Sequence, residues 1–287
     1  MNRAAWAVLA AAATGVQVGA AITATRYVAA DISPASLAFL RYAIGVACLG
    51  PPLLFAHVRF ARADILPIAA LGIGQFGVLI ALLNYGLKTV PAGRGALIFA
   101  TFPLLTLVVA ALAGHERVTR AKLVGILLTL AGVALALGDK IGGAGSLAGE
   151  VAILASAATG AVCSVLYRPY LRRYTTLPVS AFAMAAAAAA LLVPAALDDL
   201  AAAPFSLTAG AWAAIVFIGL SSGGGYVLWL WALKTIAATR VTVFLALSPI
   251  TAAALGAVFL GEAVTAMMIA GVVCVAAGLW VANKPGL

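Results

Sequence analysis

The sequence predicts an all-α integral membrane protein of ten transmembrane helices, arranged as two inverted-topology five-helix repeats. The first observation is composition: 65% of the 287 residues are hydrophobic and only 9% are charged, whereas soluble domains keep roughly a quarter of their residues charged. The second is that apolar runs of about 20 residues, long enough to cross a bilayer as a helix, recur along the chain. The third is an internal duplication at a spacing of 146 residues.

Charged residues and turn formers divide the chain into ten spans, each predicted to be a helix because an open sheet would leave backbone groups unpaired in lipid. The spans are 4–24, 34–56, 65–87, 92–113, 121–138, 147–167, 178–197, 208–233, 238–260 and 264–283. The first span follows Arg3 as in a secretory signal peptide. We nevertheless expect it to be retained, because its AAAATG resembles ASAATG at 155–160, which is internal.

The duplication aligns the third to fifth spans with the eighth to tenth spans without a gap. Its matches include residue types that are rare in this chain and hard to align by chance. They are Lys88, Arg94, Pro103 and Glu116 in the first half, which pair with Lys234, Arg240, Pro249 and Glu262 in the second. We therefore predict two repeats, residues 1–140 and 141–287.

The distribution of Lys and Arg indicates the orientation in the membrane. A repeat with an odd number of spans places its second copy upside down. With a cytoplasmic N-terminus, twelve of the 17 cations lie on the cytoplasmic side: Arg3, Arg59, Arg62, Arg117, Arg120, Lys122, Arg168, Arg172, Arg173, Lys234, Arg240 and Lys284. Four, Arg26, Lys88, Arg94 and Lys140, lie outside, and Arg41 lies within a span. Because cytoplasmic loops are enriched in Lys and Arg, both termini are predicted to be cytoplasmic, in the cell (inner) membrane.

The third and eighth spans are dense in glycine at matching positions. They read LGIGQFGVLIALLNYG and GLSSGGGYVLWLWAL, and the offset pairs Gln75 with Ser221. Glycine-interrupted segments at corresponding places in two halves point to a binding site near the membrane midplane. Gln75, Ser221 and Ser222 are therefore candidate substrate-binding groups. The alternative is that the glycines only allow helices to pack closely.

Five further polar or aromatic residues are candidates for the same site. Tyr226 and Trp229 could line a cavity or could belong to the core or the lipid face. Thr14 and Thr159 occupy matched places in the two ATG repeats, although a lone Thr in a membrane helix usually bonds within its helix or to a neighbouring helix. Gln17 is costlier to bury than a Thr and is therefore a more suggestive candidate, with a place in the cavity and a place outside it both open.

Arg41 and the paired Glu residues have alternative roles. Arg41 could attract a substrate carboxylate in an outer vestibule, but we expect it to extend toward the lipid headgroups. Glu116 and Glu262 each precede a helix, where a carboxylate suits the helix N-terminus, so direct contact with substrate is not expected. Lys88, Arg94, Lys234 and Arg240 flank short turns, where they can reach phosphates or terminal carbonyls.

Several activities lack residues to support them. No Asp, Glu or Lys lies clearly at the centre of a span, so proton coupling is not indicated and the site suits a zwitterionic, uncharged or amphipathic molecule. Cys48, Cys163 and Cys274 lie in apolar runs without ligand neighbours, so no metal or cofactor is expected. No nucleophile–base pair indicates an enzyme, and no aromatic–basic module indicates a nucleic-acid partner.

The ten spans and the two five-helix units resemble the EamA branch of the drug/metabolite transporter superfamily. A Pro…Glu…Gly…Gly pattern in the last helices of each half also carries the resemblance: Pro103, Glu116, Gly125 and Gly132, then Pro249, Glu262, Gly271 and Gly278. Arg41 also lies where many members have an arginine. The resemblance covers nearly the whole chain, and it is specific for the family but weak for the substrate.

The resemblance implies a secondary transporter of small metabolites, often an exporter of amino acids or related compounds. It also implies a central cavity between the halves that opens alternately to each side. A flippase for a lipid-linked or amphipathic substrate is the alternative, and it would show a lateral opening lined by basic residues. A membrane scaffold is a third possibility. We expect a monomer or weak homodimer, with a small-molecule substrate and membrane lipid as partners.

Overall fold

The computed structural model describes residues 3–28, 31–54, 59–87, 89–90, 98–137, 146–198, 200–201, 207–260 and 265–283. Every regular element in these segments is a helix. The elements are α1 (Arg3–Val28), α2 (Pro34–Leu54), α3 (Arg62–Gly72), the π-helix η1 (Ile73–Val78), α4 (Leu79–Leu87), α6 (Phe102–Leu112), α7 (Arg120–Leu137), α8 (Leu147–Leu166), α9 (Arg168–Arg173), α10 (Thr176–Leu197), α12 (Ala209–Thr235), α13 (Ala238–Thr242), the 3₁₀-helix η3 (Val243–Ala246), α14 (Leu247–Leu260) and α15 (Ala266–Asn283).

The helices are apolar and long enough for an integral membrane protein. Five stretches can cross a bilayer by length and composition: Arg3–Thr25, Arg62–Gly86, Leu147–Arg173, Thr176–Leu197 and Ala209–Thr235. Shorter apolar helices lie at Pro34–Gly50, Phe102–Leu112, Ala238–Thr251 and Ile269–Ala282. These helices follow the predicted spans. The predictions for Lys88, Arg94, Lys140, Glu262 and Lys284 fall outside the described residues.

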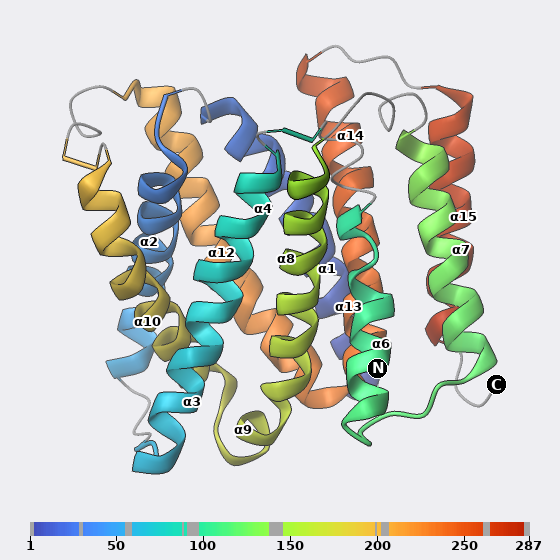
Figure 1. Ribbon diagram of the computed structural model, residues 1–287, viewed down its shortest axis with the longest axis horizontal. Coiled ribbons are helices and arrows are strands. Elements are labelled where there is room, and N and C mark those ends of the chain that lie inside the picture. The colour runs from blue at the N-terminus through green and yellow to red at the C-terminus, as the bar shows by residue number, and fades with distance from the viewer. Residues whose placement is uncertain are drawn as a thin grey trace.

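The bundle has two outer helix pairs and a central group. In Figure 1, α2 and α10 lie at one edge and α7 and α15 at the other, with α1, α8, α12 and the α3–η1–α4 segment between them. The helices run between two opposite faces, and the start of α1 and the end of α15 both lie toward the lower face (Figure 1). The short helix α9, which the sequence did not predict, also lies on this face.

Glycines of the two halves hold α7 and α15 together by reciprocal contacts. A Cβ at Gly132 would lie 2.8 Å from the carbonyl oxygen of Gly271, and a Cβ at Gly278 would lie 2.7 Å from that of Gly125. The shift of 146 residues converts one contact into the other, because it pairs Gly132 with Gly278 and Gly125 with Gly271. An exchange of this kind is what a twofold relation between two copies produces.

Replacing Gly132 by Ala should destabilise the protein by about 1–3 kcal/mol, the usual cost of overpacking. The new Cβ would lie 2.7 Å from the backbone nitrogen of Val275, and that backbone atom cannot move aside by a change of rotamer. Gly224→Ala is the matched control, since a Cβ there meets nothing within 4 Å. Thermal unfolding in detergent measures both variants. Equal midpoints for the two variants would show that the α7–α15 packing is wrong.

The glycines of the two ATG repeats occupy related interfaces. Gly15 lies against the backbone of Phe244 in η3, so that α1 contacts the ninth predicted span. Gly160 lies against the ring of Phe102 in α6, so that α8 contacts the fourth. A side chain at either glycine would clash. The glycines of the two ATG repeats therefore allow the same kind of close helix packing in each half.

The glycine-dense third span contains a π-helical segment, η1, between α3 and α4. Gly72, just before it, lies directly against the carbonyl of Ala183 in α10. On the other side, Cys163 Sγ donates to the carbonyl of Leu71 (3.8 Å) and Ser156 Oγ to that of Leu79 (2.9 Å). π-Bulges of this kind are frequent at functional sites. The one here contains Gln75, near the middle of the continuous α3–η1–α4 stretch.

Candidate functional site

The middle of α12 is hydrogen-bonded to α1 and α2. Gln17 Nε2 donates to Ser221 Oγ at 3.1 Å, and Arg41 Nε donates to Ser222 Oγ at 2.7 Å. Both serine hydroxyls in turn donate to the carbonyl of Ile218 in their own helix. Ser222 is equally far from the two ends of α12, and Gln17 lies near the middle of α1. This polar group therefore lies at about half the depth of the bundle.

Glycine brings α1 close to this group. The carboxamide of Gln17 lies over Gly225, where a Cβ would clash with Gln17 Oε1. One turn earlier in α1, Thr14 Oγ1 donates to the carbonyl of Ala10 at 2.8 Å and approaches that of Gly225 at 3.4 Å. The hydroxyl of Thr14 is thus used by backbone carbonyls, which supports its packing role.

A row of aromatic rings extends from this polar group through the core. The ring of Tyr42 lies 4.7 Å from that of Phe76, and Phe76 lies 4.4 Å from Tyr226. Tyr226 in turn packs edge-on against Tyr167 at 6.1 Å. Arg41 begins the row, with its guanidinium carbon 5.5 Å from the centre of the Tyr42 ring. Residues from α2, η1 and α12 and from the end of α8 therefore meet here.

Three buried polar atoms in this region have no hydrogen-bond partner. They are Gln75 Oε1, Tyr167 Oη and Tyr226 Oη; a fourth such atom among the described residues, Thr239 Oγ1, lies at the start of α13. Leaving a buried polar atom unpaired costs about 1–3 kcal/mol. Such atoms are rare in folded proteins and need an explanation, such as a ligand or ordered water.

The structure brings most of the predicted site residues together. Gln17, Arg41, Ser221 and Ser222 form the hydrogen-bonded group, while Gln75 and Tyr226 have the unpartnered atoms. Trp229 is 5% exposed and packs in the hydrophobic core one turn beyond Tyr226. Thr159 is separate from the group, because its hydroxyl donates to the carbonyl of Ala155 in its own helix at 2.8 Å.

Arg41 differs from the sequence-based expectation. Its side chain does not extend outward to headgroups but is turned into the bundle, toward Ser222 and the Tyr42 ring. A hydrogen bond from a charged donor and a cation–π contact both favour this position. None of the carboxylates that the structure describes lies within ion-pair distance of Arg41.

Tyr42 and Tyr167 belong to the region, although the sequence did not indicate them. Tyr167 stands next to Arg168 near the end of a predicted span, where a tyrosine usually marks the membrane interface. It is nevertheless completely buried, as Tyr42 nearly is. Their ring partners lie far along the chain, so no local pattern reveals them.

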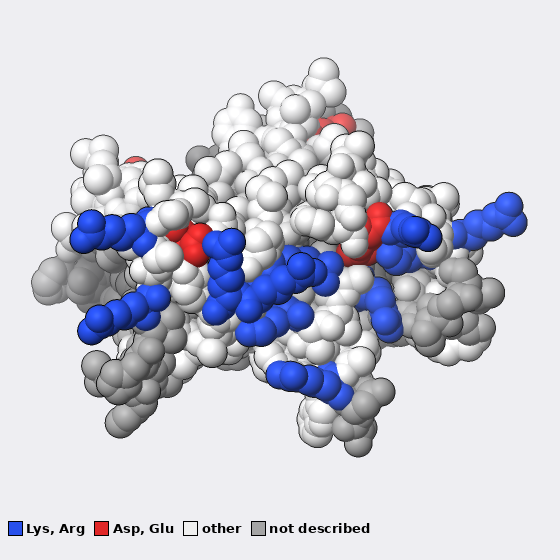
Figure 2. Space-filling view, turned by 90° about the horizontal axis from the view of Figure 1, so that it is seen from below, with Lys and Arg blue, Asp and Glu red and all other residues white. Residues whose placement is uncertain are grey.

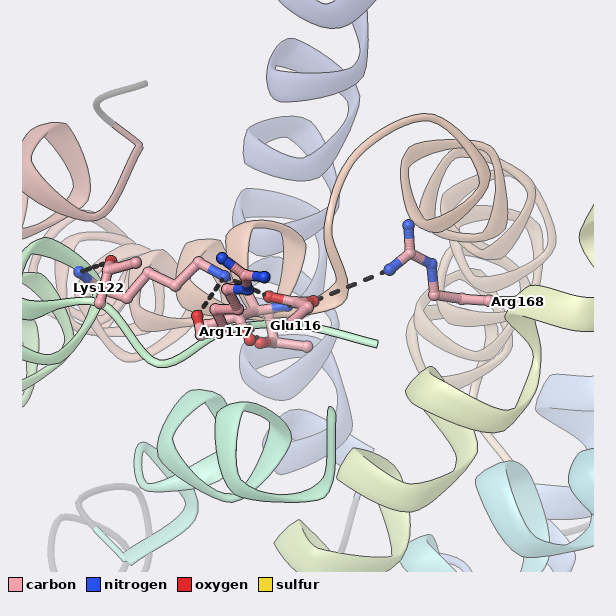
Figure 3. Close-up of polar contacts among 7 residues, drawn as sticks. Glu116, Arg117, Lys122 and Arg168 are labelled. Carbon is pink, nitrogen blue, oxygen red and sulfur yellow. Dashed lines mark hydrogen bonds and ion pairs between the residues drawn. The ribbon is translucent and has the colours of Figure 1, made fainter. Parts of the chain in front are cut away.

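A second polar network joins several elements on the lower face of Figure 1. Figure 2 shows that Lys and Arg side chains gather on this face. At its centre Glu116, whose side chain is 3% exposed, pairs with Lys122 at 2.7 Å and with Arg168 at 3.9 Å (Figure 3). Glu116 Oε1 also accepts a hydrogen bond from the backbone nitrogen of Thr239 at 3.3 Å. One carboxylate thus connects the α6–α7 loop to the start of α9 and the start of α13.

The Glu116 carboxylate therefore interacts with a helix N-terminus as predicted, but the helix is a different one. The sequence places its carboxylate at the N-terminus of the helix that follows, whereas the structure places it at the first turn of α13 in the other half. Lys234 likewise reaches a terminal carbonyl, that of Tyr174, at 3.0 Å. Asp64 adds a neighbouring contact: it accepts hydrogen bonds from Arg173 at 3.1 Å and from Tyr174 Oη at 2.6 Å.

No group of three or more His, Cys, Asp or Glu residues among the described segments could hold a metal ion. A shallow groove of about 460 Å³ lies away from the polar group, between the start of α6 and α7. Its lining is almost entirely apolar: Ile98, Thr101, Leu127, Leu130, Ala131 and Ala134. No basic residue lines it.

Polar side chains that gather at half depth in a bundle of membrane helices are typical of membrane transporters. The sequence matches the model of the EamA-like transporter family twice, over residues 5–138 and 147–284. The chain belongs to the EamA-like transporter family, and the resemblance based on the Pro…Glu…Gly…Gly pattern is confirmed.

Curated relatives extend over most of the chain. A probable terminal-alkyne amino-acid exporter of Streptantibioticus cattleyicolor is 31% identical, over 99% of this chain and 94% of its own. An uncharacterized transporter of Archaeoglobus fulgidus is 27% identical, over 92% and 93%. A probable amino-acid metabolite efflux pump of Salmonella typhimurium is 25% identical, over 80% and 85%.

The fold is also found in a solved structure. A protein of known crystal structure superposes with a TM-score of 0.82 over 96% of each chain, at 24% sequence identity. This similarity shows that the two chains share a fold.

Proposed function

We propose that the protein is a secondary transporter that exports small zwitterionic or amphipathic metabolites, such as amino acids. The observation that carries the proposal is the polar group at half depth, where Arg41 and the unpartnered atoms of Gln75 and Tyr226 lie in an otherwise apolar core. Polar and charged residues at this depth are costly, and in membrane proteins they usually mark substrate or ion pathways. Two relatives, named as a probable terminal-alkyne amino-acid exporter and a probable amino-acid metabolite efflux pump, support this substrate class.

The transport mechanism is alternating access between two inverted five-helix repeats, residues 1–140 and 141–287. The duplication, the reciprocal glycine contacts of α7 and α15 and the double match to the family model support this mechanism. The Lys and Arg residues of the lower face support a cytoplasmic location for both termini, in the cell (inner) membrane. We further propose that the chain crosses the membrane ten times and that the protein is a monomer or weak homodimer.

The Glu116 network closes the cytoplasmic end in this state. Its carboxylate connects parts of both repeats, since Glu116 belongs to the first and both Arg168 and Thr239 belong to the second. The Asp64 contacts also connect the repeats, because Arg173 and Tyr174 follow α8. Opening toward the cytoplasm would separate the repeats here and break these contacts.

Reconstitution into liposomes tests the proposed function. We expect counterflow of a labelled amino acid from a panel that also contains purines and drugs, with and without a pH gradient. Gln17→Ala should reduce this counterflow at least about tenfold, because a polar contact in the site is worth about 1.4 kcal/mol or more when lost. Ser180→Ala is the control, since that hydroxyl donates within α10. Flux of lipid alone would contradict the proposal and support the flippase.

The flippase is the less supported alternative. It requires a lateral opening lined by basic residues that accompany a charged headgroup through the membrane. The groove beside α6 and α7 is lined by apolar side chains and Thr101, without a basic residue. Arg41, in contrast, points toward α12 in the interior.

A further inference from the structure

Arg41 has the properties of an anion-binding residue. Its Nε hydrogen bonds to Ser222, and its guanidinium lies over the ring of Tyr42. No ion pair involving Arg41 occurs among the described residues. A guanidinium has five N–H donors in a planar fork that fits a carboxylate through two parallel hydrogen bonds. The terminal nitrogens of Arg41 are free of any contact that the structure describes, so this fork can be completed by a ligand.

The unpartnered atoms of Gln75, Tyr167 and Tyr226 are all able to accept hydrogen bonds from a ligand. Gln75 Oε1 can only accept hydrogen bonds, and the hydroxyls of Tyr167 and Tyr226 can each accept one. Gln75 follows Gly74, which faces Cys163 of α8, and precedes Phe76, which packs on Tyr226. Gln75 therefore belongs to the segment of η1 that α8 and α12 approach. A group with several donors would satisfy these acceptors, and the faces of the neighbouring rings would attract it if it is a cation.

The two subsites are adjacent along α12. Ser222, the partner of Arg41, and Tyr226 are four residues apart in one helix, which places their Cβ atoms about 5–6 Å from each other on the same face. The ring of Phe76 contacts both Tyr42, beside Arg41, and Tyr226. A single small molecule can therefore reach both subsites.

We propose that Arg41 binds a carboxylate and that Gln75, Tyr167 and Tyr226 bind the ammonium group of the same small molecule. This inference rests on the proposed transport function and assigns each end of a zwitterion to named residues. Ser222 holds Arg41 in position while the site is empty, since its hydroxyl accepts from Nε and leaves the two terminal nitrogens for the ligand. A dianionic ligand would leave Gln75 Oε1 unsatisfied, because this oxygen can only accept hydrogen bonds.

Binding to the purified protein in detergent tests the assignment independently of transport. The probes are the amino acid with the strongest binding, its primary amide, which lacks the carboxylate, and its des-amino acid, which lacks the ammonium group. We expect each analogue to bind at least about tenfold more weakly than the amino acid, because a hydrogen bond to a charged group contributes about 1.5–3 kcal/mol.

Two variants separate the subsites. Arg41→Gln should bring the affinity of the amino acid down to that of its amide, while the des-amino acid stays a poorer ligand than the amide. Gln75→Leu combined with Tyr226→Phe should remove the discrimination against the des-amino acid and keep that against the amide. Arg172→Gln, which removes an exposed cation from α9, should change neither ratio.

The results of these binding and transport measurements distinguish the assignment of the subsites from the proposed function. Equal binding of the amino acid and both analogues to the wild type would overturn the assignment, even if amino acids are transported. The assignment would also be overturned if each of the two variants lost the discrimination against both the amide and the des-amino acid. The expected binding pattern without counterflow would support the assignment and contradict the proposed function. If no amino acid is either bound or transported, both are wrong.

Discussion

Replacing Tyr226 by Phe is expected to stabilise the empty protein and at the same time to impair transport. Phe keeps the ring contacts with Phe76 and Tyr167 but removes a buried hydroxyl that makes no hydrogen bond of good geometry and whose polar neighbour is the Tyr167 hydroxyl. Removing this poorly satisfied group should raise the free energy of unfolding by about 1 kcal/mol, the lower end of the cost of a buried unpaired polar group. Substrate binding should weaken at least about tenfold if the hydroxyl accepts a hydrogen bond from a charged group of the ligand.

The opposite signs of the two effects make this prediction specific. Thermal unfolding in detergent measures the first effect, and counterflow in liposomes measures the second. Thr106→Val is the control, because the Thr106 hydroxyl is buried but already donates to the carbonyl of Phe102 at 2.9 Å. A lower unfolding midpoint for Tyr226→Phe, with unchanged counterflow, would mean that the hydroxyl has only a structural role.

Replacing Glu116 by Gln is expected to weaken the cytoplasmic closure. Removing the charge leaves Lys122 and Arg168 without their shared carboxylate. We expect a loss of up to about 3 kcal/mol, at the lower end for a broken buried ion pair, because the two cations are 17% and 20% exposed. Asp198→Asn, at the exposed end of α10, is the control and should change little.

The native thiol of Cys163 reports the conformational part of this prediction. Cys163 is buried beside η1, so it should react slowly with a maleimide while the cytoplasmic end is closed. With Cys48 and Cys274 replaced by Ala, Glu116→Gln should speed the labelling of Cys163 in inside-out vesicles. Unchanged labelling together with an unchanged unfolding midpoint would rule out the network as a closure.

The features that depend on composition and repetition were predictable from the sequence. Long apolar runs determine where helices form, because only helices satisfy the backbone in lipid. The 146-residue offset matches Gly132 with Gly278, and in the structure Gly132 lies against Gly271 as Gly278 lies against Gly125. The polarity of Gln17, Ser221 and Ser222 was sufficient to nominate them, since polar groups at half depth need partners.

The features that depend on distant partners were not predictable. Arg41 is held by Ser222, 181 residues later, and nothing local shows which way the side chain turns. Glu116 accepts a hydrogen bond from Thr239, which lies 123 residues later in the chain. The sequence suggests the nearer helix instead, because it does not show this distant partner. The glycines around Gln75 indicated a weakened helix but not a π-helix, because that geometry depends on contacts with Ala183 and α8.

The central claim is that two copies of one helical unit face opposite sides of the membrane and enclose the site between them. Thr119 and Thr265 are related by the 146-residue offset and precede α7 and α15. A single cysteine at each position, in a chain otherwise free of cysteine, can be labelled in intact cells with a membrane-impermeant maleimide. We expect labelling at 265 from outside and at 119 only after the cytoplasmic side is exposed. Labelling of both positions from the same side would contradict it.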